Sequence, residues 1–149
     1  MTAVLQSHQS LRASVLAQDL RAYFGKIRRR MREQTEAGDL TPSQVSVLLR
    51  LENDGPATAS SLARAEGMRP QSIVPVIAAL EDAGLVAGAS DPTDGRQTIL
   101  SLTQACRTWL AQGRAARQDW LTRTLQARLS PKEQDKLAEA LELLKRLLD

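Results

Sequence analysis

The sequence contains one cysteine, one histidine and four aromatic side chains among its 149 residues. The single cysteine, Cys106, cannot form an internal disulfide, which suits a reducing cytoplasm. His8 is far from Cys106 in the chain, so the two residues do not supply a zinc site or a Cys–His or Ser–His–Asp catalytic set. We therefore predict a cytoplasmic protein that is not an enzyme and that holds no metal and no cofactor.

Long apolar runs and a leader sequence are also missing. No uncharged apolar stretch approaches the roughly 18 residues that a membrane-spanning helix needs. Residues 1–16 lack the basic start and long apolar segment of a secretory signal peptide. Hydrophobic residues make up 42% of the chain and charged residues 25%, as in ordinary globular proteins. We therefore expect a single domain that makes no contact with a membrane.

Charge and aromatic residues are distributed unevenly along the chain. Residues 1–40 carry seven basic and four acidic groups, and residues 104–149 carry nine basic and six acidic groups, so each segment has a net charge of +3. Residues 41–103 carry four basic and seven acidic groups, a net charge of −3, and contain no aromatic residue. The middle segment must therefore build its core from aliphatic side chains.

Apolar spacing and capping residues predict three helices in the first half of the chain. The first is expected from about Leu11 to Met31, with His8 in a frayed terminus before it. A capping box at Thr41–Gln44 starts the second helix, and Thr58 caps a short third helix. The apolar residues predicted for the second helix are Val45, Val47, Leu48 and Leu49.

A fourth helix and two strands are predicted next. The helix begins at Pro70 and ends where Gly84 can take a left-handed backbone conformation. The strands are Leu85–Ser90 and Arg96–Leu102, joined by a turn at Asp91–Gly95. The alternation in the second strand predicts that its leucines point to the opposite face from Ile99 and Ser101.

Two further helices are predicted at the C-terminal end. One runs from Thr103 to about Leu129, and the last follows a second capping box at Ser130–Glu133. The chain is therefore expected to be mainly α with a small β-hairpin.

The middle segment has the element order of a winged helix-turn-helix. A short helix, a turn at Gly67 and a second helix precede the hairpin. In such a unit the second helix enters the DNA major groove, with its N-terminal residues nearest the bases. Here those residues are Arg69, Gln71 and Ser72, and all three side-chain types can bond base edges. They are the predicted DNA-binding residues of this helix.

Two stretches resemble the MarR family of bacterial transcription regulators. They are MRPQSIVPVIAALEDAGLV (residues 68–86) and DPTDGRQTILSLT (residues 91–103), and the second contains the Asp-x-Arg wing signature as Asp94 and Arg96. The resemblance covers nearly the whole chain. It implies that Arg96 lies in or near the DNA minor groove, with Asp94 holding its guanidinium by a bidentate pair.

The resemblance also implies an assembly. Residues 1–40 would form an N-terminal dimerisation helix, residues 41–103 the winged helix-turn-helix, and residues 104–149 the C-terminal dimerisation helices. A homodimer would present two recognition helices to double-stranded DNA at a pseudo-palindromic operator, as a transcriptional regulator and most simply a repressor.

Three features depart from the family pattern. The strand before the wing has no basic residue, the middle segment is net negative, and the recognition helix carries Val74, Pro75 and Ala78 where polar groups are common. Pro75 is expected to remove one helical hydrogen bond and bend the helix. Either these residues contact thymine methyl groups, with Pro75 part of the DNA-binding surface, or the protein is an effector-binding or protein-interaction member of the fold with weak DNA binding.

A small aromatic or anionic effector is a further implication of the resemblance. Tyr23, Phe24, Arg28 and Trp109 could line its pocket, but an aromatic core beside a solvated basic face explains the same residues. Cys106 is expected to be a small buried apolar residue rather than a reactive thiol.

Overall fold

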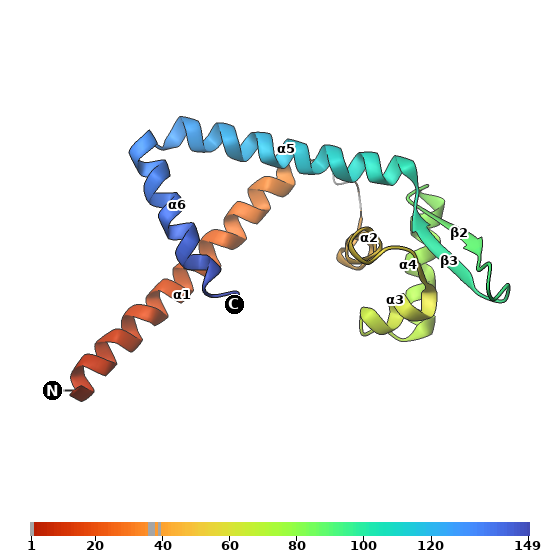
Figure 1. The fold of residues 1–149 in the computed structure, drawn as a ribbon, viewed down its shortest axis with the longest axis horizontal. Helices are drawn as coiled ribbons and strands as arrows, with labels where there is room; N and C mark the ends of the chain where they lie inside the picture. Colours follow the sequence, from red (N-terminus) through yellow and green to blue (C-terminus); the bar gives the residue numbers. More distant parts are fainter. Residues whose placement is uncertain (1, 36–37, 39) are drawn as a thin grey trace. The chain divides into compact units, whose positions relative to one another are not determined.

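The computed structural model describes residues 2–35, 38 and 40–149. It is mainly helical with a small antiparallel sheet (Figure 1), which confirms the predicted fold class. In chain order the elements are α1 (Thr2–Glu33), α2 (Pro42–Asp54), β1 (Ala57–Thr58), α3 (Ala59–Ala65), α4 (Pro70–Asp82), β2 (Val86–Ser90), β3 (Thr98–Leu102), α5 (Gln104–Arg128) and α6 (Pro131–Lys145). No helix of the described residues is long and apolar enough to cross a membrane.

The chain divides into two compact units. The first combines Met1–Glu36 with Ala115–Asp149, and the second is Ala37–Arg114, which we call the winged unit. All the side chains that are buried in the described part of the chain belong to the winged unit. They are aliphatic apart from Cys106, as the lack of aromatic residues in the middle segment predicted.

Local capping fixes where the helices of the winged unit begin. Thr41 accepts a hydrogen bond from the Gln44 backbone N–H, and the Gln44 side chain accepts one from the Thr41 N–H, which completes the predicted capping box. Thr58 accepts a hydrogen bond from the Ser61 N–H and caps α3 as predicted. The same box forms at Ser130 and Glu133, at the start of α6.

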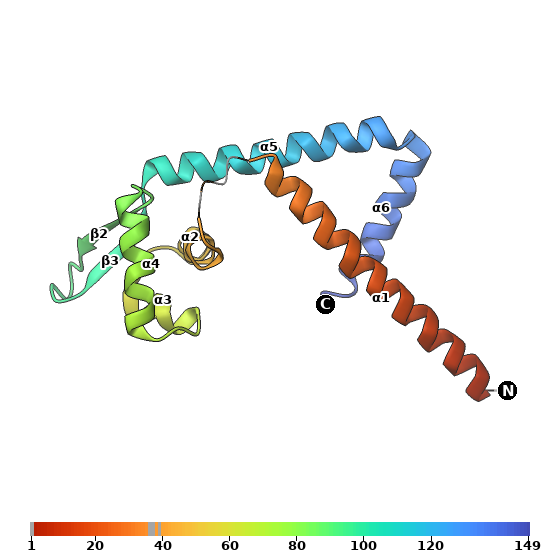
Figure 2. The same cartoon turned by 180° about the vertical axis from the view of Figure 1, so that it is seen from behind.

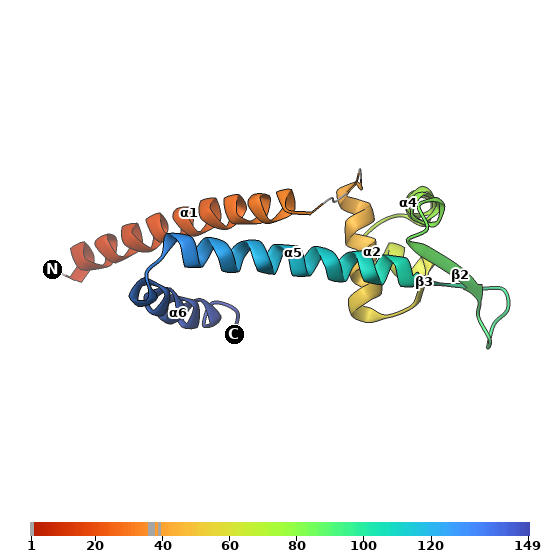
Figure 3. The same ribbon diagram turned by 90° about the horizontal axis from the view of Figure 1, so that it is seen from above.

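The sheet has three strands in the order β1-β3-β2, all antiparallel. Val86 pairs with Leu102 and Ser90 pairs with Thr98, so β2 and β3 form the predicted hairpin. Figures 2 and 3 show this hairpin projecting past α4. The two leucines of β3 are buried while Ile99 and Ser101 are partly exposed, so the predicted alternation is confirmed. β1 was not predicted from the sequence.

Two details of the helices differ from the sequence prediction. α1 begins at Thr2 rather than near Leu11, so His8 lies within a helix and not in a frayed terminus. No glycine or proline interrupts residues 2–10, so nothing local stops the helix there. In α2, Val47 and Leu48 are buried, but Val45 and Leu49 are exposed and Leu51 completes the buried face.

A candidate nucleic-acid interface

The turn between α3 and α4 depends on Gly67. Its φ of 64° is in the left-handed region, which glycine adopts without a steric cost. The Met68 N–H donates to the Ala63 carbonyl at 2.8 Å, and the Gly67 N–H donates to the Arg64 carbonyl at 3.2 Å. These two bonds form a Schellman motif that ends α3. The chain can therefore turn sharply and start α4 three residues later.

The first turn of α4 presents three predicted site residues to solvent. Arg69 is the N-cap residue, and its side chain makes no capping hydrogen bond. Its backbone carbonyl instead accepts from the Ser72 N–H at 2.9 Å, while Pro70 occupies the first helical position. Arg69, Gln71 and Ser72 are exposed. Their polar groups are thus available to an external partner, next to the positive end of the helix dipole.

Beyond this first turn the outward face of α4 is apolar. Ile73, Ile77 and Leu80 are buried in the core of the winged unit. The exposed residues of the same stretch are Val74, Pro75, Ala78 and Ala79. Pro75 lies inside the helix as predicted and has no N–H to donate to the Gln71 carbonyl. The helix continues through this position, and the bend stays a prediction.

The wing loop is built from two consecutive aspartate turns. Asp91 Oδ1 accepts from the Thr93 N–H at 2.9 Å and from the Thr93 hydroxyl at 2.8 Å. These bonds, the backbone one first, lower the pKa of the Asp91 carboxyl. The Asp91 N–H donates to the Gln97 carbonyl at 2.9 Å, and the Gln97 N–H donates to the Asp94 carbonyl at 3.0 Å. The loop is therefore closed by its own hydrogen bonds.

Asp94 does not pair with the Arg96 guanidinium, and this prediction was wrong. Asp94 Oδ1 accepts from the Arg96 backbone N–H at 3.1 Å instead. A carboxylate two residues before a free N–H satisfies that donor at little cost in side-chain entropy, so the local bond competes with the ion pair. Within the described residues the Arg96 guanidinium has no ion-pair partner.

Thr103 joins α4, the wing and α5. Its hydroxyl donates to the Gly84 carbonyl at 2.7 Å and accepts from the Cys106 N–H at 3.1 Å, and its own N–H donates to the Leu85 carbonyl at 3.1 Å. From the sequence, Thr103 was predicted only as the first residue of a helix, with no contact assigned to its side chain. A threonine directly before a helical run is an N-cap signal that could have identified it.

The six arginines of the winged unit divide into two groups. Arg50 donates to Glu66 at 2.7 Å, Arg107 donates to the Leu102 carbonyl at 2.6 Å, and Arg114 pairs with Glu52 at 2.6 Å. The other three are exposed and have no ion-pair partner among the described residues: Arg64, Arg69 and Arg96. Sequence reasoning did not select Arg64. The unpaired arginines lie on α3, at the start of α4 and in the wing.

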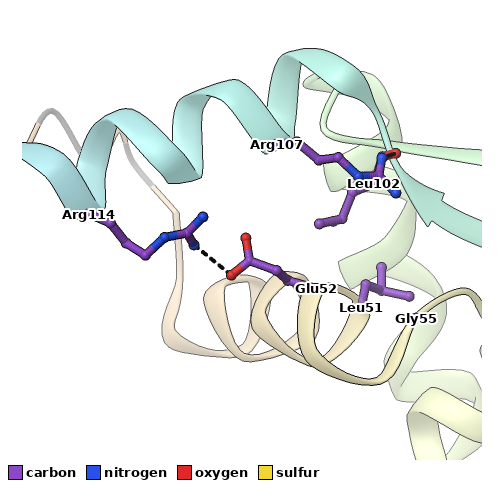
Figure 4. Close-up of a pocket in the computed structure, with 6 residues that line it drawn as sticks. All are labelled: Leu51, Glu52, Gly55, Leu102, Arg107 and Arg114. Atoms are coloured by element: carbon purple, nitrogen blue, oxygen red, sulfur yellow. Dashed lines mark hydrogen bonds and ion pairs between the residues drawn. The ribbon is translucent and has the colours of Figure 1, made fainter.

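An open cavity of about 420 Å³ lies between α2 and α5 (Figure 4). It is lined by Leu51, Glu52, Gly55, Leu102, Arg107 and Arg114. None of the four residues predicted for an effector pocket is in this lining. Cys106, which directly precedes Arg107 in the chain, is fully buried. Burial raises the pKa of its thiol, and the negative charge of Glu52 raises it further. This confirms the expected apolar role of Cys106.

A helix-turn-helix followed by a β-hairpin wing is an architecture typical of DNA-binding proteins. Residues 40–98 match the model of the MarR family. The uncharacterized HTH-type transcriptional regulator Mb0904 of Mycobacterium bovis is 37% identical over 134 residues, which cover 90% of this chain and 93% of the relative. The chain therefore belongs to the MarR family of HTH-type transcriptional regulators. Membership of this family confirms the prediction that it is not an enzyme.

Solved structures show the same fold. A crystal structure of a transcriptional regulator protein from Pseudomonas aeruginosa has a TM-score of 0.76 and 36% identity, covering 90% of this chain and 94% of the other. A mutant of MepR from S. aureus, bound to an oligodeoxyribonucleotide, has a TM-score of 0.70 with 21% identity, covering 89% and 97% of the two chains. At that identity the second likeness concerns the fold alone.

Proposed function

We propose that this regulator binds double-stranded DNA through Arg64, the first turn of α4 and the wing. The observation that carries the proposal is the position of the three unpaired arginines, since all three lie on the helix-turn-helix and its wing. The remaining arginines of the winged unit are held by internal contacts. A mutant of MepR, which shares the fold, is bound to an oligodeoxyribonucleotide in its solved structure.

In this proposal the predicted site residues have separate roles. Arg69, Gln71 and Ser72 contact base edges in the major groove, where their donor and acceptor groups match those of guanine and adenine. Arg96 neutralises phosphate or enters the minor groove. Asp94 shapes the wing turn through the Arg96 N–H rather than by holding the guanidinium. Pro75 contributes apolar surface to α4.

We further propose that the protein acts in the cytoplasm as a homodimer that represses transcription by occupying a pseudo-palindromic operator. The first unit has no buried side chain in its described residues, so its apolar side chains need a partner surface. A two-fold dimer would place two recognition helices about 34–36 Å apart, one helical turn of DNA.

The direct test is selection of random duplex DNA by the purified protein at two salt concentrations. We expect enrichment of a pseudo-palindrome with half-sites one helical turn apart. If Arg64 and Arg96 of each protomer each neutralise one phosphate, the four contacts of a dimer predict a slope of log K against log salt of roughly −4. No enrichment at low salt would instead support the interaction protein, which the net −3 charge of residues 41–103 and the unbasic strand β2 favour.

The proposed effector is a small aromatic or anionic molecule that releases the DNA. The cavity between α2 and α5 supports the anionic class, because two arginines, Arg107 and Arg114, and one acid, Glu52, are among its lining residues. A carboxylate ligand would compete with Glu52 for Arg114. We expect an aromatic carboxylate to quench tryptophan fluorescence and weaken DNA binding. A panel of such compounds with neither effect would contradict this part of the proposal.

A further inference from the structure

The exposed face of α4 is polar in its first turn and apolar beyond it. Arg69, Gln71 and Ser72 are polar, yet no exposed charged or polar side chain follows until Glu81. Val74 is 58% exposed, which is a large exposure for a β-branched apolar residue in a helix. Its side chain does not belong to the core of the winged unit, which the opposite face of α4 completes. The packing of the fold therefore does not require an apolar residue at this position.

The exposed apolar residues form a continuous stripe with the polar first turn. Residues three and four apart lie on the same face of a helix, so Gln71, Val74 and Ala78 follow one another along it, with Pro75 beside them. From Gln71 to Ala78 the helix rises about 10 Å. This length matches roughly three base pairs at the ~3.4 Å spacing of duplex DNA. One stripe can therefore face successive base pairs of a half-site.

The groups that base pairs present in the major groove limit which of them an apolar stripe can contact favourably. Of the groups that the four base pairs present there, only the C5-methyl group of thymine is apolar. A guanine, cytosine or adenine edge against Val74 would lose water without gaining a hydrogen bond. We propose that Val74 contacts the C5-methyl group of a thymine in each half-site, and that this contact selects thymine at that position. The inference rests on the proposed DNA binding.

The test removes the methyl group without changing base pairing. In the operator obtained by selection, each thymine of the half-site is replaced by deoxyuridine, symmetrically in both half-sites, and binding is measured by fluorescence anisotropy. At one position we expect the affinity of the unchanged protein to fall about fourfold for each methyl group, or about fifteenfold for the two half-sites together. At that position the affinity of the Val74→Ala protein should not change when thymine is replaced by deoxyuridine. At every other position the Val74→Ala protein should respond as the unchanged protein does.

A methyl group on a different base provides the reverse experiment. With cytosine at the same position, 5-methylcytosine should bind the unchanged protein more tightly than cytosine does, by about fourfold for each half-site. The Val74→Thr protein keeps the shape of the side chain but replaces a methyl by a hydroxyl, so its preference should be much smaller. Because Val74 lies outside the core, both variants should remain folded at the temperature of the binding assay.

The outcomes separate the inference from the proposed function. If the protein binds DNA and no deoxyuridine position affects the affinity, or if Val74→Ala keeps the full sensitivity, the methyl contact is overturned and DNA binding stands. If the unchanged protein binds no duplex at low salt, the proposed function fails and the inference fails with it.

Discussion

The charged side chains of the winged unit differ in what they contact. Arg50, Arg107 and Arg114 bond to groups of the unit itself, whereas Arg64, Arg69 and Arg96 have no ion-pair partner among the described residues. An exposed arginine without a partner contributes little to folding. Its removal should therefore affect binding more than stability.

Arg96 provides the clearest test of this separation. Arg96→Ala should weaken binding to all DNA sequences and make the salt slope shallower by about one unit for each phosphate that the arginine neutralises. The free energy of unfolding should not change measurably. Arg96→Lys keeps the charge and should restore most of the slope. Titrations at several salt concentrations would check both variants, and an unchanged slope in Arg96→Ala would exclude the phosphate contact.

For single residues, the sequence predicted which side chains lie at the site. It was less successful in predicting the hydrogen-bond partners of those side chains. Arg69, Gln71 and Ser72 are exposed at the start of α4 because Gly67 and Pro70 determine the turn locally. The partner of Asp94 was missed because a backbone N–H two residues away competes with the guanidinium. The choice between such close competitors depends on three-dimensional geometry that spacing alone does not contain.

Among the elements, α4 ends as sharply as it begins. Gly84 has a φ of 73°, its N–H donates to the Glu81 carbonyl at 2.9 Å, and the Leu85 N–H donates to the Leu80 carbonyl at 3.0 Å. This is the predicted glycine C-cap, in the form of a Schellman motif. The motif places the Gly84 carbonyl where Thr103 can donate to it.

Replacing this glycine should therefore cost stability through the backbone alone. A Cβ at Gly84 would contact nothing within 4 Å, but its positive φ is strained for other residues. We expect Gly84→Ala to lower the free energy of unfolding by about 1–2 kcal/mol. Gly95→Ala is the matched control, since its Cβ also meets nothing and its φ is outside this region. Urea unfolding that affects the two variants equally would contradict this explanation.

A second stability prediction concerns the contact between α2 and the end of α3. The Glu66 carboxylate accepts hydrogen bonds from the Arg50 guanidinium and from the Ser46 hydroxyl, each at 2.7 Å. The bond from Arg50, followed by that from Ser46, lowers the pKa of this carboxyl. Because the pKa is lower in the folded state, the stabilisation is present above the ordinary glutamate range and declines as pH falls through the lowered value. Glu66→Gln should cost about 1 kcal/mol at neutral pH.

The difference between Glu66→Gln and the unchanged protein should then disappear in acid. The control is Glu81→Gln, which removes an exposed carboxylate that has no ion pair among the described residues. Chemical unfolding across the acidic range would reveal the contrast. A constant difference at every pH would mean that the carboxylate charge is not what stabilises the contact.

The sequence predicted these elements to different degrees. Helix starts at Thr41, Thr58 and Ser130 were correct because capping boxes and N-caps involve residues within one turn. β1 was missed because two residues are too few for a strand pattern, and its pairing with β3 is long-range. The exposed Val45 and Leu49 show the same limit, since an apolar residue does not reveal which face the fold will bury.

For the whole molecule, the two units differ in how their apolar residues are covered. The winged unit buries its own core, whereas α1 and α6 expose large apolar side chains. On these helices they are Leu11, Val15, Leu16, Tyr23, Phe24, Ile27, Leu137, Leu141 and Leu143. A second copy of the chain is the partner expected for a surface of this kind.

A charged residue introduced into this apolar surface should dissociate the proposed homodimer into monomers. Leu141 is 50% exposed on α6, so Leu141→Glu should not disrupt a core but should oppose burial in a dimer. We expect sedimentation of the unchanged protein as a dimer at micromolar concentration and of the variant as a monomer with weaker operator binding. Glu139→Lys on the same helix controls for a change of charge alone. A monomeric unchanged protein would refute the dimer.

The placement of charge on α4 also affects how the molecule would meet a polyanion. Arg69 stands at the N-terminal end, whereas Glu81 and Asp82 lie in the last turn, so the side chains add to the polarity of the helix dipole instead of opposing it. The net charge of −3 on residues 41–103 therefore does not describe the electric field around this helix. Near a polyanion we expect this arrangement to favour orientations of the winged unit in which the arginine end of α4 faces the negative charge. We therefore expect the charges of α4 to orient this helix toward a polyanion, and this effect should persist in variants whose overall charge is altered elsewhere on the surface.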